Sequence, residues 1–207
     1  MGVPGLYKKE YIDKQFERRE LFAAIAEKYG IRSALYPGSF VHVTPSFTIP
    51  RVVYVDSFKG AKKFFDDGEA VRVFIEANKE YAEPASYRFI PMDYAKDLPL
   101  AGETFDLLIS QWAGPISQTC KEYLKPGGIL LANNSHADAG LAYLDPDYEF
   151  VAVVKANKGR FSISEKNLPE YFIPKKAQKI SLESLIGSGK GIAYTKTASS
   201  YLFRKRD

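Results

Sequence analysis

The chain has little sulfur, little histidine and no long apolar run. Its 207 residues include one cysteine, two histidines, two methionines and one tryptophan. The single cysteine, Cys120, excludes a disulfide framework and a metal cluster built on several cysteines of this chain, and we expect no metal site. No apolar stretch approaches the roughly 18 residues of a membrane span, and the amino terminus lacks a signal-peptide pattern. We therefore expect a cytoplasmic protein with no membrane partner.

Charge is distributed unevenly along the chain. There are 29 Lys and Arg against 25 Asp and Glu, a net charge of +4. From residue 155 to residue 207, 12 basic residues stand against 4 acidic ones, a balance of +8, so the rest of the chain carries −4. Such asymmetry can mark contact with nucleic acid, but the lysines are scattered and no nucleic-acid motif accompanies them. A small-molecule partner is favoured, nucleic acid stays open, and nothing indicates the oligomeric state.

Short apolar, β-rich runs alternate with helical patterns over most of the chain. We expect strands at 33–36, 51–57, 87–94, 105–112, 128–134, 147–156 and 201–205. Helical patterns cover 8–29, 59–82 and 115–128. This alternation predicts an α/β fold with a mostly parallel sheet and helices on both faces. The length suggests one domain over 1–207, with a helical lead over 1–30 and an insertion over 157–199 between the last two strands.

The stretch "ALYPGSFVHVTPSFTIPRVVYVDS", residues 34–57, has the layout of a nucleotide-binding βαβ unit. Gly38 would let the backbone approach a ligand closely. Asp56 follows Gly38 by 18 residues, near the roughly 20 that separate the glycine turn from the ribose-binding acid in dinucleotide folds. The turn carries one glycine where such turns usually have two or three, and Phe40 and His42 occupy neighbouring positions. A ribose-binding role is favoured for Asp56 over that of a simple strand terminator.

The order of these pieces resembles the class I S-adenosylmethionine-dependent methyltransferase superfamily. "FDLLISQWAGPISQTCKEYLKPGGILLANN" (105–134) is similar to that family's fourth strand, the following helix, its "LKPGG" turn and the fifth strand. "VVYVDS" (52–57) resembles the second strand, and "FIPMDYAKDLP" (89–99) resembles the third. The resemblance implies a Rossmann-like, doubly wound sheet of seven strands in the order 3-2-1-4-5-7-6, with the last strand antiparallel.

The same resemblance implies S-adenosylmethionine as cofactor and a set of residues that contact it. Asp56 would bind the ribose hydroxyls and Asp93 the adenine, with Tyr94 beside it. The first loop is divergent, because Tyr36 stands where the family usually has an acid. The residues expected to border the cofactor are Tyr36, Gly38, Ser39, Asp56, Ser57, Asp93, Tyr94, Gln111 and Trp112.

The acceptor of the methyl group is not identified by the sequence, and a small molecule is expected. Methyl transfer asks little of side chains beyond positioning, so a general base is optional. His42 and His136 are the two candidates, because imidazole exchanges protons near neutral pH. Segment 157–199 is the candidate for acceptor specificity.

Two other functions stay open. One is a non-catalytic Rossmann-like module that binds or regulates after losing the donor, an alternative that Tyr36, Phe40 and His42 favour. The other is a nicotinamide-dependent oxidoreductase, against which the missing glycines and the "LKPGG" turn count.

Overall fold

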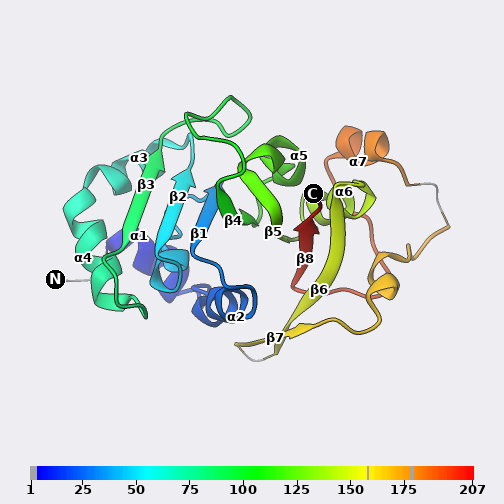
Figure 1. Ribbon diagram of the computed structural model, residues 1–207, viewed down its shortest axis with the longest axis horizontal. Helices are drawn as coiled ribbons and strands as arrows, with labels where there is room; N and C mark the ends of the chain where they lie inside the picture. Colours follow the sequence, from blue (N-terminus) through cyan, green and yellow to red (C-terminus); the bar gives the residue numbers. More distant parts are fainter. Residues whose placement is uncertain (1–3, 158, 178–179) are drawn as a thin grey trace. The chain divides into compact units, whose positions relative to one another are not determined.

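A computed structural model describes residues 4–157, 159–177 and 180–207. The chain divides into two compact units, Met1–Leu98 and Pro99–Asp207, and each is described by itself (Figure 1). The organisation as one domain therefore stays a prediction. Among the described residues, no helix combines the length and the apolar character needed to cross a bilayer.

The first unit contains three parallel strands in the order β3-β2-β1. They are β1 (Ser33–Pro37), β2 (Arg51–Val55) and β3 (Ser86–Ile90). The register places Leu35 beside Val53 and Val53 beside Arg88. The first three strands and their predicted order 3-2-1 are confirmed. However, β3 ends at Ile90, so Asp93 and Tyr94 lie beyond the strand that the sequence predicts to include them.

The helices of the first unit begin with the short α1 (Gly5–Tyr7) and η1 (Lys8–Ile12), followed by α2 (Arg19–Tyr29). Gly30 ends α2 in the left-handed conformation at φ 65°, where glycine is favoured. A short 3-10 helix, η2 (Thr44–Phe47), follows β1. The helix predicted over 59–82 is instead two helices, α3 (Lys59–Asp66) and α4 (Gly68–Asn78). The break occurs because Asp67 leaves the helical conformation and its side chain caps α4, accepting from the Ala70 N–H at 3.4 Å.

The second unit contains five strands in the order β4-β5-β8-β6-β7. They are β4 (Phe105–Ser110), β5 (Leu124–Ala132), β6 (Tyr148–Asn157), β7 (Arg160–Ser164) and β8 (Ser200–Lys205). β4 and β5 are parallel, whereas β8 pairs antiparallel with both β5 and β6. The predicted order 4-5-7-6 and the antiparallel last strand are therefore confirmed, with β8 as the predicted seventh strand.

The described residues form eight strands rather than the predicted seven, because β7 was missed. β7 lies inside the 157–199 insertion and pairs antiparallel along β6, with Phe161 beside Ala156 and Ile163 beside Val154. Its sequence "RFSIS" alternates apolar and polar side chains, which is the pattern of a half-buried strand.

The helices of the second unit are short: α5 (Ile116–Thr119), η3 (Lys121–Tyr123), α6 (Asp138–Leu144), η4 (Leu168–Phe172) and α7 (Leu182–Ser188). The helix predicted over 115–128 is wrong beyond Tyr123, because β5 takes the residues from Leu124 onward. Pro126 has no N–H for a helical hydrogen bond, and Gly127 adopts φ 74°. The "LKPGG" stretch is thus the start of a strand.

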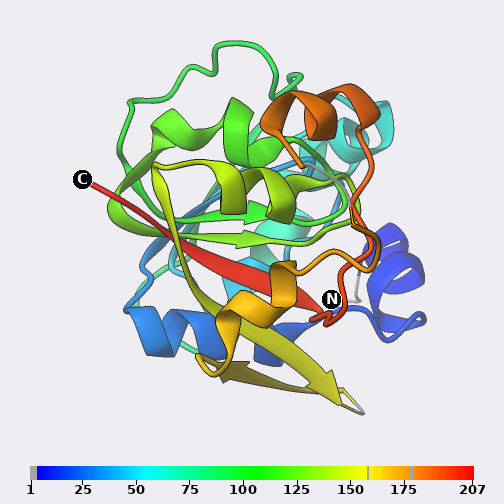
Figure 2. The same ribbon diagram turned by 90° about the vertical axis from the view of Figure 1, so that its right-hand side faces the viewer.

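Besides the pairing of β7, the 157–199 insertion contacts the rest of its own unit at several points. Near its start, the Phe172 ring stacks on Tyr143 of α6 at 4.0 Å and meets Phe150 of β6 edge-on at 5.0 Å. Further along, Leu185 of α7 packs with Ala137 and Leu141, and Figure 2 shows α7 beside α6. The Asn134 side chain, just past β5, donates to the Ile192 carbonyl at 3.0 Å. The later part of the insertion therefore lies against the carboxyl end of β5.

Candidate functional site

The first loop is held directly against the end of β2. The N–H groups of Gly38 and Ser39 both donate to the Val55 carbonyl, at 2.8 and 3.3 Å. The Phe40 N–H donates to Oδ2 of Asp56 at 2.8 Å. Gly38 adopts φ 64°, a conformation that suits glycine. The structure thus brings Gly38, Ser39 and Asp56 together, as expected from the sequence, but through backbone N–H groups that point inward.

Asp56 is half-buried, and its carboxylate accepts from the backbone of two phenylalanines. Its second oxygen, Oδ1, accepts from the Phe58 N–H at 2.8 Å. The rings of Phe40 and Phe58 lie 5.6 Å apart, and Phe58 is 58% exposed. Phe40 adopts φ 48°, which is unusual for a bulky residue and strained. The sequence reasoning named Phe40 only as an obstacle and missed Phe58; an aromatic two residues after a strand-end acid was the signal available.

Tyr36, in β1, and His42, in the loop that follows, are both buried. The His42 Nε2 lies 2.9 Å from the Glu17 carbonyl, which can only accept, so Nε2 carries the proton. Nδ1 is then an acceptor for the Tyr36 hydroxyl at 3.1 Å. The Tyr11 ring stacks on the imidazole at 4.2 Å. Both nitrogens are occupied, and burial lowers the pKa of His42 to about 3, so the structure gives His42 a structural role rather than that of a base.

The buried His42 predicts a pH dependence of stability. Its folded pKa lies below the usual value near 6.5, so its contribution to stability is present above that value and is lost as the pH falls. Between pH 7 and pH 5 the wild type should lose about 2 kcal/mol more unfolding free energy than His42→Gln. Urea denaturation at both pH values measures this. Equal pH dependence of wild type and His42→Gln would contradict the prediction.

The remaining predicted residues of the first unit lie at the surface or near it. Ser57 and Asp93 are exposed and Tyr94 is half-buried. The Asp93 side chain accepts from the Ala95 N–H at 2.9 Å, so it caps a turn. The end of β3 is tied to Asp56, because the Asp56 N–H donates to the Ile90 carbonyl at 3.2 Å. The adenine contact of Asp93 stays a prediction.

Gln111 and Trp112 belong to the second unit, where they follow β4. Gln111 is buried, and its Nε2 donates to the Ser110 carbonyl at 3.1 Å and to the Ser200 hydroxyl at 3.4 Å. Trp112 is 45% exposed and adopts φ 58°, which is rare for a large side chain. Of the two, only Trp112 is exposed, and the cofactor contact of either residue stays a prediction.

His136 is exposed and follows β5 in the same unit. Its Nδ1 lies 3.0 Å from the Ser135 hydroxyl, which lies 2.7 Å from Oδ1 of Asn133. Because the serine has one proton and the amide oxygen can only accept, Ser135 donates to Asn133 and accepts from Nδ1–H. This tautomer leaves the lone pair on Nε2. The sequence reasoning named His136 but missed Ser135 and Asn133, which the run "NNSH" would have suggested.

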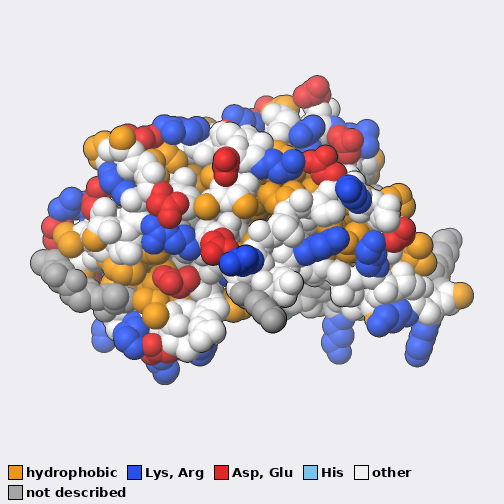
Figure 3. Space-filling model, turned by 90° about the horizontal axis from the view of Figure 1, so that it is seen from below, with side chains coloured by type: hydrophobic (Ala, Val, Ile, Leu, Met, Phe, Trp, Pro, Cys, Tyr) orange, Lys and Arg blue, Asp and Glu red, His pale blue; other side chains and the backbone are white. Residues whose placement is uncertain are grey.

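Basic and acidic side chains are interspersed on the face of the molecule in Figure 3. In the second unit, for example, Lys121 pairs with Asp145 at 2.8 Å and Lys196 pairs with Glu170 at 2.7 Å. This distribution adds no support to the nucleic-acid alternative.

The strand order and directions within the two units define the fold of the class I S-adenosylmethionine-dependent methyltransferases, with β7 as an addition. A methyltransferase from Geobacter sulfurreducens matches 99% of this chain and 91% of its own at a TM-score of 0.52 and 9% identity. At such low identity the likeness shows the fold alone.

Other solved structures are similar over less of the chain. An O-methyltransferase from Bacillus cereus, solved in complex with S-adenosylhomocysteine, matches 70% of this chain and 77% of its own, with a TM-score of 0.47 and 11% identity. A protein from Methanococcus maripaludis matches 63% of this chain at a TM-score of 0.45 and 13% identity, and the match spans only 60% of that protein. No family model and no curated protein matches the sequence.

Proposed function

We propose that the chain binds S-adenosylmethionine through its first unit and transfers the methyl group to a small-molecule acceptor. The observation that carries the proposal is the position of Asp56: a half-buried carboxylate directly after β2, facing the loop that follows β1. In open α/β sheets, ligands bind beyond the carboxyl ends of the strands.

The residues present fit the adenosine part of such a donor. Each Asp56 oxygen accepts one backbone N–H, and a carboxylate has about four acceptor positions, so each oxygen can accept one ribose hydroxyl. The exposed Phe58 ring offers an apolar face beside the carboxylate. The loop N–H groups of Gly38, Ser39 and Phe40 are already used within the protein, so the amino-acid end of the donor would need other partners.

The bound donor would supply a methyl group on a sulfonium leaving group. The chain's own residues would hold the ribose through Asp56 and shield one side of it through Phe58. In the second unit, His136 has the local arrangement of a base, because Ser135 and Asn133 fix its tautomer with Nε2 free to accept a proton. Segment 157–199 is the proposed source of acceptor specificity, supported by its packing at the carboxyl end of β5.

A binding or regulatory module without catalysis is the second candidate function. The observation that favours it is the internal use of all three loop N–H groups, together with Tyr36 being buried where the family usually has an acid. Such a loop would hold a nucleoside without orienting the rest of the donor.

Calorimetric titration of the purified chain with S-adenosylmethionine, S-adenosylhomocysteine, adenosine and NAD distinguishes these functions. We expect saturable binding of both methionine-derived ligands and weaker binding of NAD. Binding of adenosine as tight as that of S-adenosylhomocysteine would favour the module. No heat with any S-adenosyl ligand at millimolar concentration would contradict the proposed function.

A further inference from the structure

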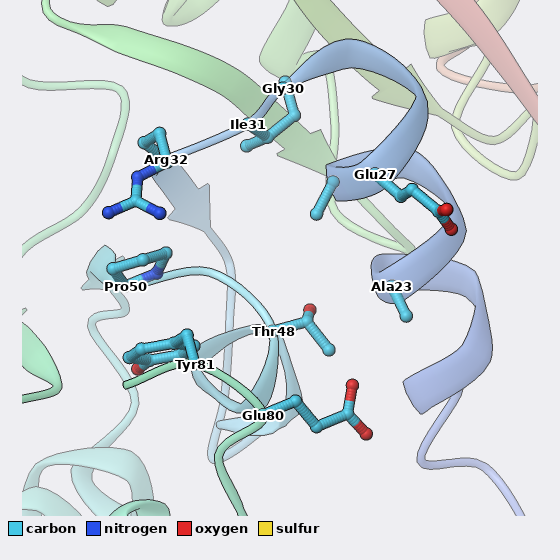
Figure 4. Close-up of a pocket in the computed structure, with 10 residues that line it drawn as sticks. Ala23, Glu27, Gly30, Ile31, Arg32, Thr48, Pro50, Glu80 and Tyr81 are labelled. Carbon is cyan, nitrogen blue, oxygen red and sulfur yellow. The ribbon is translucent and has the colours of Figure 1, made fainter. Parts of the chain in front are cut away.

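A cavity of about 410 Å³ lies in the first unit at the amino ends of β1 and β2. Asp56 stands at the carboxyl end of β2, so the cavity is at the opposite end of these strands. Helix α2 forms one wall with Ala23 and Glu27, and Thr48, Glu80 and Tyr81 line the other (Figure 4). The volume is within the range of about 300–1,000 Å³ that is usual for small-molecule sites.

The cavity exists because α2 turns small side chains toward it. Ala23 and Ala26 leave space where longer side chains would fill the groove, and the buried Ile31 lies after the end of the helix. The opposite wall is fixed, because the Tyr81 hydroxyl donates to the Ser46 carbonyl at 2.8 Å and leaves the ring as a lining surface. The body of a ligand would therefore meet mainly apolar atoms.

The charge around the cavity is negative. Its lining carries two carboxylates, Glu27 and Glu80, against one guanidinium, Arg32. The ion-pair partners do not change this balance, because Arg19 pairs with Glu80 at 2.7 Å and Glu83 pairs with Arg32. In Figure 4, the carboxylates of Glu27 and Glu80 extend on the same side of the cavity, and Arg32 lies on the other. A cation is thus favoured near α2.

One lining hydroxyl also lacks a partner. The buried Thr48 Oγ1 makes no hydrogen bond with the described residues, and Figure 4 shows it inside the ring of lining side chains. A buried hydroxyl without a partner is unfavourable. Because a hydroxyl both donates and accepts, any polar group of an occupant that reached this atom would relieve the cost, and the preference for a cation rests on the lining carboxylates.

We propose that this cavity is a binding site for a small primary alkylamine in its protonated form. The ammonium group lies toward Glu27 and Glu80, and the alkyl body lies over Ile31 and the Tyr81 ring. The proposal does not depend on methyl transfer, since the cavity and Asp56 are at opposite ends of the strands.

Titration of the 15N-labelled chain with n-butylammonium chloride tests the proposal, with butanol and butyrate as uncharged and anionic probes at matched ionic strength. We expect saturable amide shifts confined to 23–32, 48–49 and 80–81, with a dissociation constant on the order of a millimolar. Glu27→Gln should weaken binding about threefold to fivefold, as for an exposed ion pair. Glu20→Gln, on the same helix but outside the lining, should bind as the wild type does.

Ala26→Leu fills the cavity with a good helix former and should abolish the shifts while circular dichroism stays unchanged. Asp56→Ala should bind n-butylammonium like the wild type. The proposals for this cavity and for the methyl-donor site can therefore be contradicted independently of each other. The proposal is overturned by equal binding of butanol or butyrate, by shifts outside the cavity, by unchanged binding in Glu27→Gln or Ala26→Leu, or by the absence of saturation.

Discussion

Replacing Asp138 by alanine should lower the free energy of unfolding by about 3–5 kcal/mol, the largest loss of stability that we expect from one substitution. The Asp138 side chain is buried, at 1% exposure. It accepts from the Ser110 hydroxyl, from the Ser117 N–H at 3.0 and 3.1 Å and from the Ser117 hydroxyl at 2.5 Å. These bonds join the start of α6 to the end of β4 and to α5. Alanine would leave the Ser117 N–H and hydroxyl without their acceptor in the interior, and the Ser110 hydroxyl would keep only the longer bond to the Ala113 carbonyl at 3.4 Å.

Thermal denaturation measures the effect. For a chain of this length, each kcal/mol shifts Tm by about 2–4 °C, so the variant should melt about 6–20 °C lower. Asp147→Ala is the matched control, because Asp147 is exposed and pairs with Lys121 at the surface; its cost should stay below about 1 kcal/mol. Similar melting temperatures for the two variants would contradict the assigned role.

The pH dependence gives a second test of the same residue. Burial raises the pKa of the Asp138 carboxyl, while the hydrogen bonds from Ser110 and Ser117 act in the opposite direction. A raised folded pKa means that the contribution of the group to stability is complete below the ordinary value and declines as the pH rises. The difference between wild type and Asp138→Ala should therefore be larger at pH 4 than at pH 7.

The strands could be predicted because their residues carry the signal locally. Runs such as Val52–Val55 are short and consist of β-branched and aromatic residues, and their alternation with helical patterns favours parallel pairing. The position of Asp56 at the end of β2 could be predicted for the same reason, and its contact with a ribose stays a prediction. β7 was missed because it has only five residues and is an edge strand that pairs with β6 alone, so its short alternation is the one local signal that it carries.

The environment of the candidate site could not be predicted, because it depends on contacts between distant residues. The His42 imidazole is hydrogen-bonded to the Glu17 carbonyl and stacked on the Tyr11 ring, and these residues lie 25 and 31 positions earlier in the chain. His136 gains a defined tautomer from its immediate neighbours, yet the bond from Ser135 to Asn133 requires the chain to turn sharply after β5. Periodicity reports which face of an element is buried, and not which side chains meet in a loop.

Replacing Asp56 by alanine should weaken the binding of S-adenosylhomocysteine by at least about tenfold. A ribose offers two adjacent hydroxyl donors, and hydrogen bonds to a charged acceptor contribute about 1.5–3 kcal/mol each. The loss of one such bond already corresponds to about a factor of ten. Since Asp56 also accepts from the Phe40 and Phe58 N–H groups, the variant loses part of the loop geometry as well. Calorimetric titration measures the affinity, and circular dichroism reports whether the variant folds.

Two control variants distinguish the effect of the Asp56 carboxylate on binding from the effect of the residues around it. Asp67→Ala also removes a carboxylate that accepts a backbone N–H in the first unit, from Ala70, and should bind like the wild type. Phe40→Gly keeps Asp56 and suits the left-handed conformation at φ 48°, so its affinity should be unchanged or higher. Wild-type affinity in a folded Asp56→Ala variant would show that the ribose is held elsewhere. A loss in Phe40→Gly as large as that in Asp56→Ala would assign the binding to the aromatic pair instead of the carboxylate.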